Sequence, residues 1–259
     1  MVPEARVIAF CPHDHKRLLN GGGQVYQPPT AKRPGGEKDK SVDMAAARRH
    51  MVDSQVRPNR VTDVPLQKAM GEIPRERFVP AEHKAIAYAE QDVRLFDGRW
   101  LLKARDFSKL LNDTIIRPDD LVLDVGCGFG YSTAVIARLC SVVVGLEEDE
   151  KVVAMASERL AGLDIDNTVM MQGPLAEGCA RQAPFDAIIV AGGVEANLEG
   201  LLEQLKPDGG RLATIIMDGR FGSATLFTRS GHAFGERKLF EAHPAGVIPA
   251  FRRAQGFVF

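Results

Sequence analysis

The sequence predicts an α/β fold, a doubly wound parallel sheet with antiparallel strands at its C-terminal end and a helical extension at its N-terminus. From Leu121 onward, short continuous apolar runs alternate with amphipathic helical patterns, which is typical of parallel strands covered on both faces. The first apolar run ends in a glycine cluster, Gly126, Gly128 and Gly130, as expected for a tight turn into a helix. The last apolar runs have no full-length helix between them, which favours antiparallel pairing.

Composition and charge are those of an ordinary globular protein. The chain has 259 residues, 45% of them hydrophobic and 26% charged, and a net charge of −1. The positive excess lies in the first 50 residues and the rest is mildly acidic, so the body of the protein lacks the basic balance of a nucleic-acid binder. No apolar run reaches the length of a membrane span. We therefore expect a protein that binds neither nucleic acid nor membrane; the sequence leaves its oligomeric state open.

Cysteine usage argues against a metal centre and favours a reducing compartment. None of the four cysteines forms a CxxC pair, so no zinc knuckle or redox motif is predicted and a cytoplasmic location is expected. Cys11, His13 and His15 lie close together, but no further ligand follows at a suitable spacing. The prediction is that the protein holds no metal.

The chain divides into three predicted parts. Residues 1–43 are rich in Gly, Pro and Lys, which predicts a disordered or weakly ordered tail, unless translation begins at Met44 or Met51. Residues 44–111 form an N-terminal cap segment that is mostly helical. One helix there begins at Thr62 or Asp63 and is broken at Pro74; a second short helix follows, and a third starts at Arg105.

Residues 112–259 form the predicted ligand-binding domain, in which strands and helices alternate. The expected strands lie at 121–126, 141–149, 168–174, 185–193, 211–218, 223–231, 237–244 and 256–259. The expected helices lie at 131–140, 150–163 and 197–210, with a short helical stretch after the third strand.

The turn after the first strand is the predicted ligand site, because ligands of such sheets bind beyond the carboxyl ends of the strands. The turn carries GxGxG and not GxGxxG, because Tyr131 stands where a dinucleotide fingerprint has its last glycine. Asp124 precedes the turn; its carboxylate suits a cationic ligand head better than a pyrophosphate. Glu147 ends the second strand, where a carboxylate can accept both hydroxyls of a ribose. Together these residues favour a nucleoside whose charged end carries an amino acid and a sulfonium.

Several longer motifs resemble a known family. DVGCGFGYSTAVIA followed by VVVGLEED resembles the Rossmann-like fold of class I methyltransferases that use S-adenosyl-L-methionine. MVDSQVRPN, AMGEIPRERFVP, YAEQD, APFDAIIVAGG and LLEQLKPDGGRL extend the resemblance, over roughly residues 51–259, to the protein-L-isoaspartate O-methyltransferase family.

The resemblance implies an enzyme of protein repair, which methylates isoaspartyl carboxyls in damaged proteins or peptides. It assigns no catalytic residue here. The residues it implies for binding the cofactor are Asp124, Gly126, Cys127, Gly128, Glu147 and Leu175.

Two stretches depart from the family pattern. The family carries Gly-x-Thr-Ile-Ser-x-Pro ahead of the motif strand, with its serine beside the methyl-accepting carboxylate. Here Leu102 replaces that serine and Ala104 the proline, and Ser108 is expected on the following helix. The family's Gly-Asp-Gly at the third strand is Gly173-Pro174-Leu175 here; Leu175 can pack against an adenine but offers no carboxylate.

These departures leave alternatives open. The chain could be a methyltransferase of the same fold with another acceptor, or a noncatalytic nucleoside-binding relative. A nicotinamide-dependent oxidoreductase is disfavoured by Asp124 and Tyr131. Other charged residues have structural interpretations. Asp186 caps or orients the fourth strand, and IPRERFVP is a lid and brace whose arginines are solvated. Lys103 and Arg105 are solvated loop charges, or one of them attracts an anionic acceptor.

Overall fold

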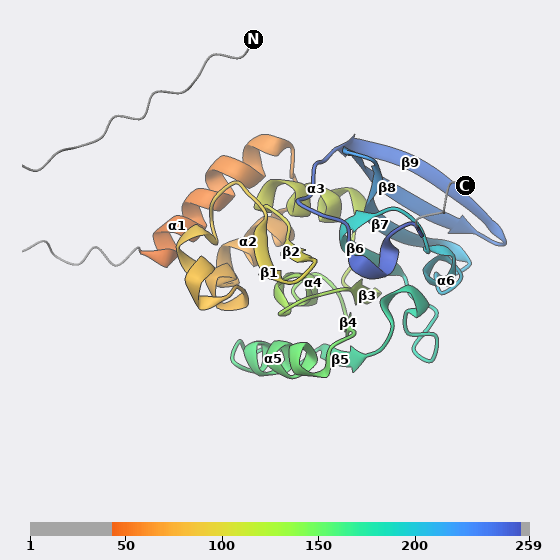
Figure 1. Cartoon of the computed structure of the whole chain (residues 1–259), viewed down its shortest axis with the longest axis horizontal. Coiled ribbons are helices and arrows are strands. Elements are labelled where there is room, and N and C mark those ends of the chain that lie inside the picture. The colour runs from red at the N-terminus through yellow and green to blue at the C-terminus, as the bar shows by residue number, and fades with distance from the viewer. Residues whose placement is uncertain (1–42, 255–259) are drawn as a thin grey trace, which may run out of the picture. The chain divides into compact units, whose positions relative to one another are not determined.

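A seven-stranded sheet forms the centre of the molecule. The computed structural model describes residues 43–254, which belong to one compact unit. The strand order is β5-β4-β3-β6-β7-β8-β9; β3 to β7 are parallel, and β8 and β9 are antiparallel to their neighbours (Figure 1). The strands are β3 (Leu121–Val125), β4 (Val142–Glu147), β5 (Thr168–Gln172), β6 (Ala187–Val194), β7 (Asp208–Asp218), β8 (Phe221–Ser230) and β9 (Ala233–Glu241). This order confirms the predicted fold class and puts the topological switch point between β3 and β6.

Helices cover the sheet on both faces. Those within the sheet domain are α3 (Ala104–Thr114), α4 (Tyr131–Ala137), α5 (Glu150–Ala161) and α6 (Glu199–Leu202), with the short 3₁₀ turns η5 (Leu175–Glu177) and η6 (Pro249–Phe251). Figure 1 shows the N-terminal helices grouped near α3, while β8 and β9 extend at the end of the sheet away from β5. Two separate apolar cores result: one contains residues of the N-terminal helices, α3 and α4, and the other contains residues of η5, α6 and η6.

The N-terminal segment is a series of short helices. They are α1 (Met44–Met51), the π-helix η1 (Val52–Val56), the 3₁₀ helices η2 (Arg57–Asn59), η3 (Arg75–Phe78) and η4 (Ala81–Ile86), and α2 (Val64–Glu72). Asp63 is the N-cap of α2, since its carboxylate accepts a hydrogen bond from the Leu66 amide at 2.9 Å. Of the two alternative starts predicted for this helix, Thr62 and Asp63, the structure confirms Asp63.

A β-hairpin within this segment was not expected. Strands β1 (Val93–Phe96) and β2 (Arg99–Leu101) pair antiparallel and form a two-stranded sheet of their own. The turn between them is Asp97-Gly98, and Gly98 has a φ of +70°. An Asp-Gly pair between short apolar runs is a strong hairpin signal, so this element was visible in the sequence.

The helix predicted over 197–210 is much shorter. Only Glu199–Leu202 is α-helical, and Asp208–Gly210 belong to β7. The cause is pairing at the start of β6: Phe185 donates to the Gln204 carbonyl at 2.8 Å and accepts from the Lys206 amide at 2.8 Å. Because of this pairing the α-helix ends at Leu202.

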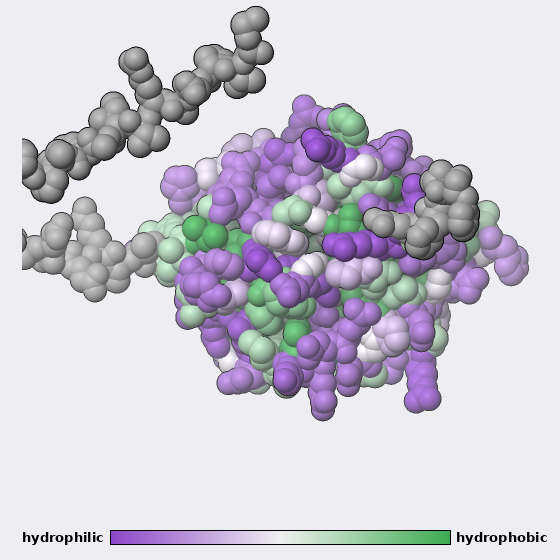
Figure 2. Space-filling model, in the orientation of Figure 1, coloured by the Kyte–Doolittle hydropathy of each residue, from purple (hydrophilic) through white to green (hydrophobic). Residues whose placement is uncertain are grey.

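Three predictions lie outside the described residues: the tail over 1–42, the Cys11, His13 and His15 group, and the strand over 256–259. Among the helices of the described part, none has the length and apolar character needed to cross a membrane. The face shown in Figure 2 is mainly hydrophilic, with hydrophobic residues in small groups.

Candidate functional site

The glycine turn connects β3 to α4 at the carboxyl edge of the sheet. Gly126, Gly128 and Gly130 all have positive φ, at +70°, +56° and +94°, a conformation that residues with a side chain adopt only with strain. A Cβ on Gly130 would meet Ala156 and Leu160 of α5 at 3.4 Å, so this glycine serves helix packing. The other two face the β1–β2 hairpin. The turn is therefore a close packing point, against α5 on one side and the hairpin on the other.

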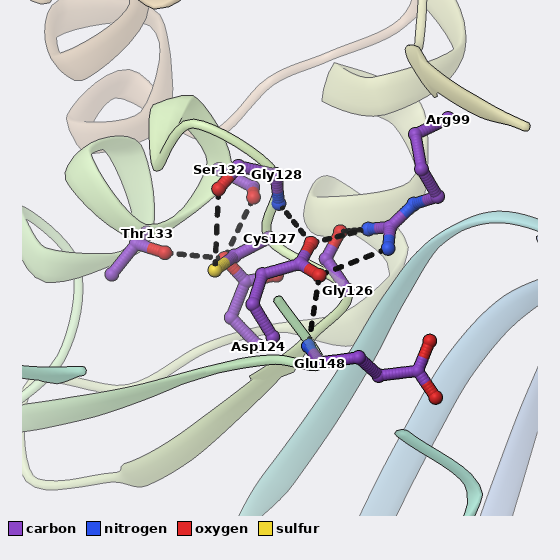
Figure 3. A network of polar contacts seen from close by, with 9 residues as sticks. Arg99, Asp124, Gly126, Cys127, Gly128, Ser132, Thr133 and Glu148 are labelled. Atoms are coloured by element: carbon purple, nitrogen blue, oxygen red, sulfur yellow. Dashed lines mark hydrogen bonds and ion pairs between the residues drawn. The ribbon is translucent and has the colours of Figure 1, made fainter. Parts of the chain in front are cut away.

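Asp124 lies fully buried beneath the turn. Ser132 and Thr133, in the first turn of α4, donate hydroxyl hydrogen bonds of 2.6 and 2.7 Å to its Oδ2 (Figure 3). Its Oδ1 is buried and has no hydrogen-bond partner among residues 43–254. Burial raises the pKa of Asp124 to about 6; the hydroxyl hydrogen bonds oppose the shift and the nearby Glu147 adds to it. An unpartnered buried carboxylate oxygen is a ready acceptor for an ammonium group.

Glu147 is also buried, and all of its hydrogen-bonding capacity is engaged. Its Oε1 accepts from the Gly128 amide at 2.6 Å and from Arg99 Nη2 at 2.5 Å. Its Oε2 accepts from Arg99 Nη1 at 3.0 Å and from the Glu148 amide at 3.2 Å. Glu148 itself is exposed, and its carboxylate points away from the network (Figure 3). The prediction that Glu147 is the acid facing the turn is consistent with this geometry.

Arg99 was missed by the sequence reasoning. Besides Glu147, it donates to the Gly126 carbonyl at 2.5 Å, so that its guanidinium joins the turn to the end of β4 (Figure 3). The available signal was its place directly after the Asp-Gly turn, because a hairpin there turns the chain back toward the carboxyl edge of the sheet. Ser132 and Thr133 were missed as well; hydroxyls in the first turn after the glycines were the signal.

The two apolar members of the predicted site also lie at the turn. The Leu175 side chain is buried and comes within 3.4 Å of the position a Gly126 Cβ would take. Cys127 is buried, and burial raises the pKa of its thiol well above the ordinary value, so it is a neutral packing group. The fold thus gathers Asp124, Gly126, Cys127, Gly128, Glu147 and Leu175 around one turn.

Leu102, at the position of the family serine, is part of the apolar core. Its side chain is 2% exposed, and its carbonyl accepts a 2.6 Å hydrogen bond from Arg75 Nη2. Arg75 Nε donates to the Ala87 carbonyl at 2.7 Å. The prediction that the arginines of IPRERFVP are solvated is therefore wrong for Arg75, which is 0% exposed and braces this loop.

The charges that follow Leu102 are paired. Lys103 Nζ and Arg105 Nε lie 3.1 and 3.0 Å from the carboxylate of Asp106, which is 0% exposed, so the expectation of two solvated charges is wrong. Ser108 lies on α3 as expected, where its hydroxyl is bonded to the Arg105 carbonyl. No hydroxyl from this stretch takes the place of the family serine.

Asp186 lies at the opposite, amino edge of the sheet. Its carboxylate accepts from the Leu121 amide at 2.8 Å and pairs with Lys206 Nζ at 2.7 Å. It ties the start of β6, the strand it was predicted to cap or orient, to the start of β3. Across residues 43–254 no group of three or more His, Cys, Asp or Glu side chains is placed to hold a metal ion.

The geometry fits a nucleoside with a cationic end, except that Arg99 already occupies the Glu147 carboxylate. Asp124 Oδ1 is a buried acceptor without a partner among the described residues, and the buried Leu175 packs beside Gly126. Glu147 is the predicted acceptor for ribose hydroxyls, and Arg99 engages both of its oxygens. Ribose binding at Glu147 requires Arg99 to move.

Comparison with known proteins defines the family. Residues 46–241 match the family model described as protein-L-isoaspartate(D-aspartate) O-methyltransferase. A protein-L-isoaspartate O-methyltransferase of Pelotomaculum thermopropionicum is 32% identical over 199 residues, which cover 77% of this chain and 86% of the relative. One from Methylorubrum populi is 34% identical over 209 residues, covering 80% and 96%.

A solved protein-L-isoaspartate O-methyltransferase shares the fold. It aligns with a TM-score of 0.68 and 23% identity, covering 79% of this chain and 67% of the other. The sheet order, the glycine turn with its two acids, and the match over most of the chain agree. This chain therefore belongs to the protein-L-isoaspartate(D-aspartate) O-methyltransferase family.

Proposed function

We propose that this chain is an S-adenosylmethionine-dependent methyltransferase that esterifies the abnormal carboxyl of L-isoaspartyl residues in damaged proteins or peptides. The observation that carries the proposal is the pair of buried carboxylates at the glycine turn, in a chain of this family. Asp124 would hold the amino group of the cofactor, Glu147 its ribose, and Leu175 its adenine. The buried free cysteines at positions 127, 140 and 179 support a cytoplasmic location.

The chemistry asks little of the protein beyond positioning. The cofactor supplies a methyl group on a positively charged sulfur, and an acceptor carboxylate oxygen displaces that sulfur to form a methyl ester and a neutral thioether. A carboxylate is already a nucleophile at neutral pH, so the protein needs no general base. Its residues have to hold the two reactants in line and exclude water. The catalytic residues stay unassigned for this reason.

A hollow at the carboxyl ends of β6 and β7 lies at the same edge of the sheet as the glycine turn and is a candidate acceptor site. Its volume is about 620 Å³, and its lining includes Glu195, Met217, Arg252 and Arg253. The parallel strands β3, β6 and β7 end at the same edge of the sheet, so the hollow opens on the side of the turn. Two arginines there favour an anionic acceptor.

The test is transfer of a labelled methyl group to an isoaspartyl peptide, with the matching aspartyl peptide as control. We expect selective transfer to the isoaspartyl peptide. Glu147→Gln should weaken binding of S-adenosylhomocysteine at least tenfold, because a neutral amide accepts the ribose hydroxyls less well. Glu148→Gln is the matched control and should bind like the wild type. Absence of transfer by folded, ligand-binding protein would refute the isoaspartyl assignment and leave the cofactor assignment in place.

A second candidate is methylation of a different acceptor. Leu102 favours it, since a buried leucine replaces the hydroxyl beside the acceptor carboxylate, and a site that loses a hydrogen-bond partner loses affinity for its substrate. Labelling of a small-molecule fraction of a cell extract, with no labelling of isoaspartyl peptide, would favour this candidate. Ligand binding without turnover on any acceptor would favour a noncatalytic relative.

A further inference from the structure

The strongest unexplained feature of the site is the buried Arg99–Glu147 pair. Nη1 and Nη2 of Arg99 lie 3.0 and 2.5 Å from the two Glu147 oxygens, in a bidentate arrangement. The two side chains are only 7% and 1% exposed. With the amides of Gly128 and Glu148, the carboxylate receives four hydrogen bonds, which is about all that its lone pairs can accept. No acceptor capacity is left for a hydroxyl pair of a ligand.

The same arginine takes up the space over the turn. A Cβ on Gly126 would lie 2.7 Å from Arg99 Nη2, and a Cβ on Gly128 would lie 2.7 Å from Leu95 Cδ1. Both contacts come from the β1–β2 hairpin. The glycines therefore accommodate the hairpin, in the place where a glycine turn otherwise accommodates a ligand.

We propose that Arg99 is a latch on the adenosyl site: it competes with the ribose hydroxyls for Glu147, and a nucleoside ligand binds only when Arg99 releases that carboxylate. The proposal rests on the cofactor site of the proposed function and adds its regulation. The apparent affinity is then reduced by the fraction of molecules in which the pair is open. Arg99 is a residue that sets the ligand affinity, with no part in the chemical step.

The contact that must open is that of the Arg99 side chain, because the hairpin itself is anchored in the apolar core by Val93 and Leu101. Within residues 43–254 its two strands, of four and three residues, pair only with each other, so a change of the Arg99 side chain breaks no hydrogen bond of the seven-stranded sheet. The charged contact of the hairpin to the turn is the Arg99 guanidinium, whereas Arg94 on the neighbouring strand pairs with Asp97 at the surface.

The chain carries its own reporter of this movement. Trp100 is its single tryptophan and lies in β2 directly after Arg99. The indole lies 3.3 Å from where a Gly246 Cβ would be, so it also rests against the segment after β9. Release of Glu147 by the adjacent Arg99 changes the charge distribution around the indole, and its fluorescence can be followed in a stopped-flow instrument.

The experiment measures S-adenosylhomocysteine binding to the wild type, Arg99→Gln and Arg94→Gln by calorimetry and by Trp100 fluorescence. In the wild type the observed rate should reach a plateau at high ligand concentration, because opening of the latch becomes limiting. Arg99→Gln should bind S-adenosylhomocysteine at least tenfold more tightly than the wild type, and its observed binding rate should rise linearly with ligand concentration. Arg94→Gln loses the same charge from the same hairpin and should behave as the wild type.

The alternative outcomes are distinct. Equal or weaker binding by a folded Arg99→Gln overturns the latch and leaves the cofactor site standing. No binding by either the wild type or Arg99→Gln overturns both proposals. Binding by Arg99→Gln alone supports both. Should Arg99→Gln fail to fold, the wild-type rates decide: a plateau supports the latch, and a linear rise up to the fastest measurable rates overturns it.

Discussion

At the scale of single residues, the site combines two buried acids whose carboxylates have different partners. Glu147 forms an ion pair with Arg99, whereas Asp124 receives only hydroxyl hydrogen bonds and, in the described part of the chain, one of its oxygens has no partner. The effect of burial at Asp124 therefore outweighs that of the two hydroxyl hydrogen bonds and raises its pKa to about 6. This acid changes charge close to neutral pH, in contrast to an ordinary aspartate.

The raised pKa predicts a pH-dependent contribution to stability. A folded-state pKa above the unfolded value means that the folded protein holds its proton more tightly, so stability falls as the pH rises from about 4 through 6. Asp124→Asn removes this contribution, and its unfolding free energy relative to wild type should improve by about 2 kcal/mol between pH 4.5 and 7. Urea unfolding at both pH values measures it. The exposed Asp119→Asn is the control. If the difference in unfolding free energy from wild type is independent of pH for both variants, the raised pKa of Asp124 is contradicted.

At the scale of elements, Arg75 connects three segments of the cap. From η3 it reaches the Ala87 carbonyl after η4 and the Leu102 carbonyl after β2, and its guanidinium lies 4.8 Å from the centre of the Tyr131 ring on α4. A planar guanidinium can serve two carbonyls at once, which a lysine ammonium in the same place cannot match. The geometry of the Leu102 loop depends on this brace.

Arg75→Lys should therefore lower the unfolding free energy by about 2 kcal/mol, because one buried carbonyl loses its donor while the buried charge remains. Thermal or urea unfolding measures the loss. Arg77→Lys, an exposed neighbour in the same helix, should change stability by less than about 0.5 kcal/mol. Similar values for the two variants would show that the brace has no energetic importance.

At the scale of the whole molecule, the two edges of the sheet have separate roles. The carboxyl edge carries the glycine turn. At the amino edge, Arg211 donates to the Thr114 and Ile115 carbonyls at 2.8 and 2.9 Å and pairs with the buried Asp120. It ties the end of α3 to the starts of β3 and β7. This contact holds the fold together at a distance from the site.

Arg211→Leu should accordingly lower the stability of the fold and leave the ligand affinity of the site unchanged. Leaving Asp120 buried and unpaired should lower the unfolding free energy by about 3 kcal/mol. S-adenosylhomocysteine affinity, measured by calorimetry below the unfolding transition, should stay within about twofold of wild type. A large loss of affinity in folded protein would show that the two edges are coupled.

The sequence by itself determined the doubly wound sheet and the residues around its turn. Continuous apolar runs such as AIIV are buried wherever the chain places them, and glycines and acids at strand ends reach the carboxyl edge of any parallel sheet. Asp124, Gly126 and Glu147 were predictable for that reason. The capping of α2 by Asp63 was equally local, since a cap depends on neighbours three residues away.

Only the tertiary structure decided which partners these residues have. Arg99 and Glu147 are 48 positions apart and meet because a two-stranded hairpin turns back over the glycine turn. The pairing of Phe185 with residues 204 and 206 likewise shortened α6, and the buried Asp106 drew in Lys103 and Arg105. Local patterns indicate what a segment prefers, whereas such contacts depend on which distant segments meet in the fold, and here they determine whether the Glu147 carboxylate is free.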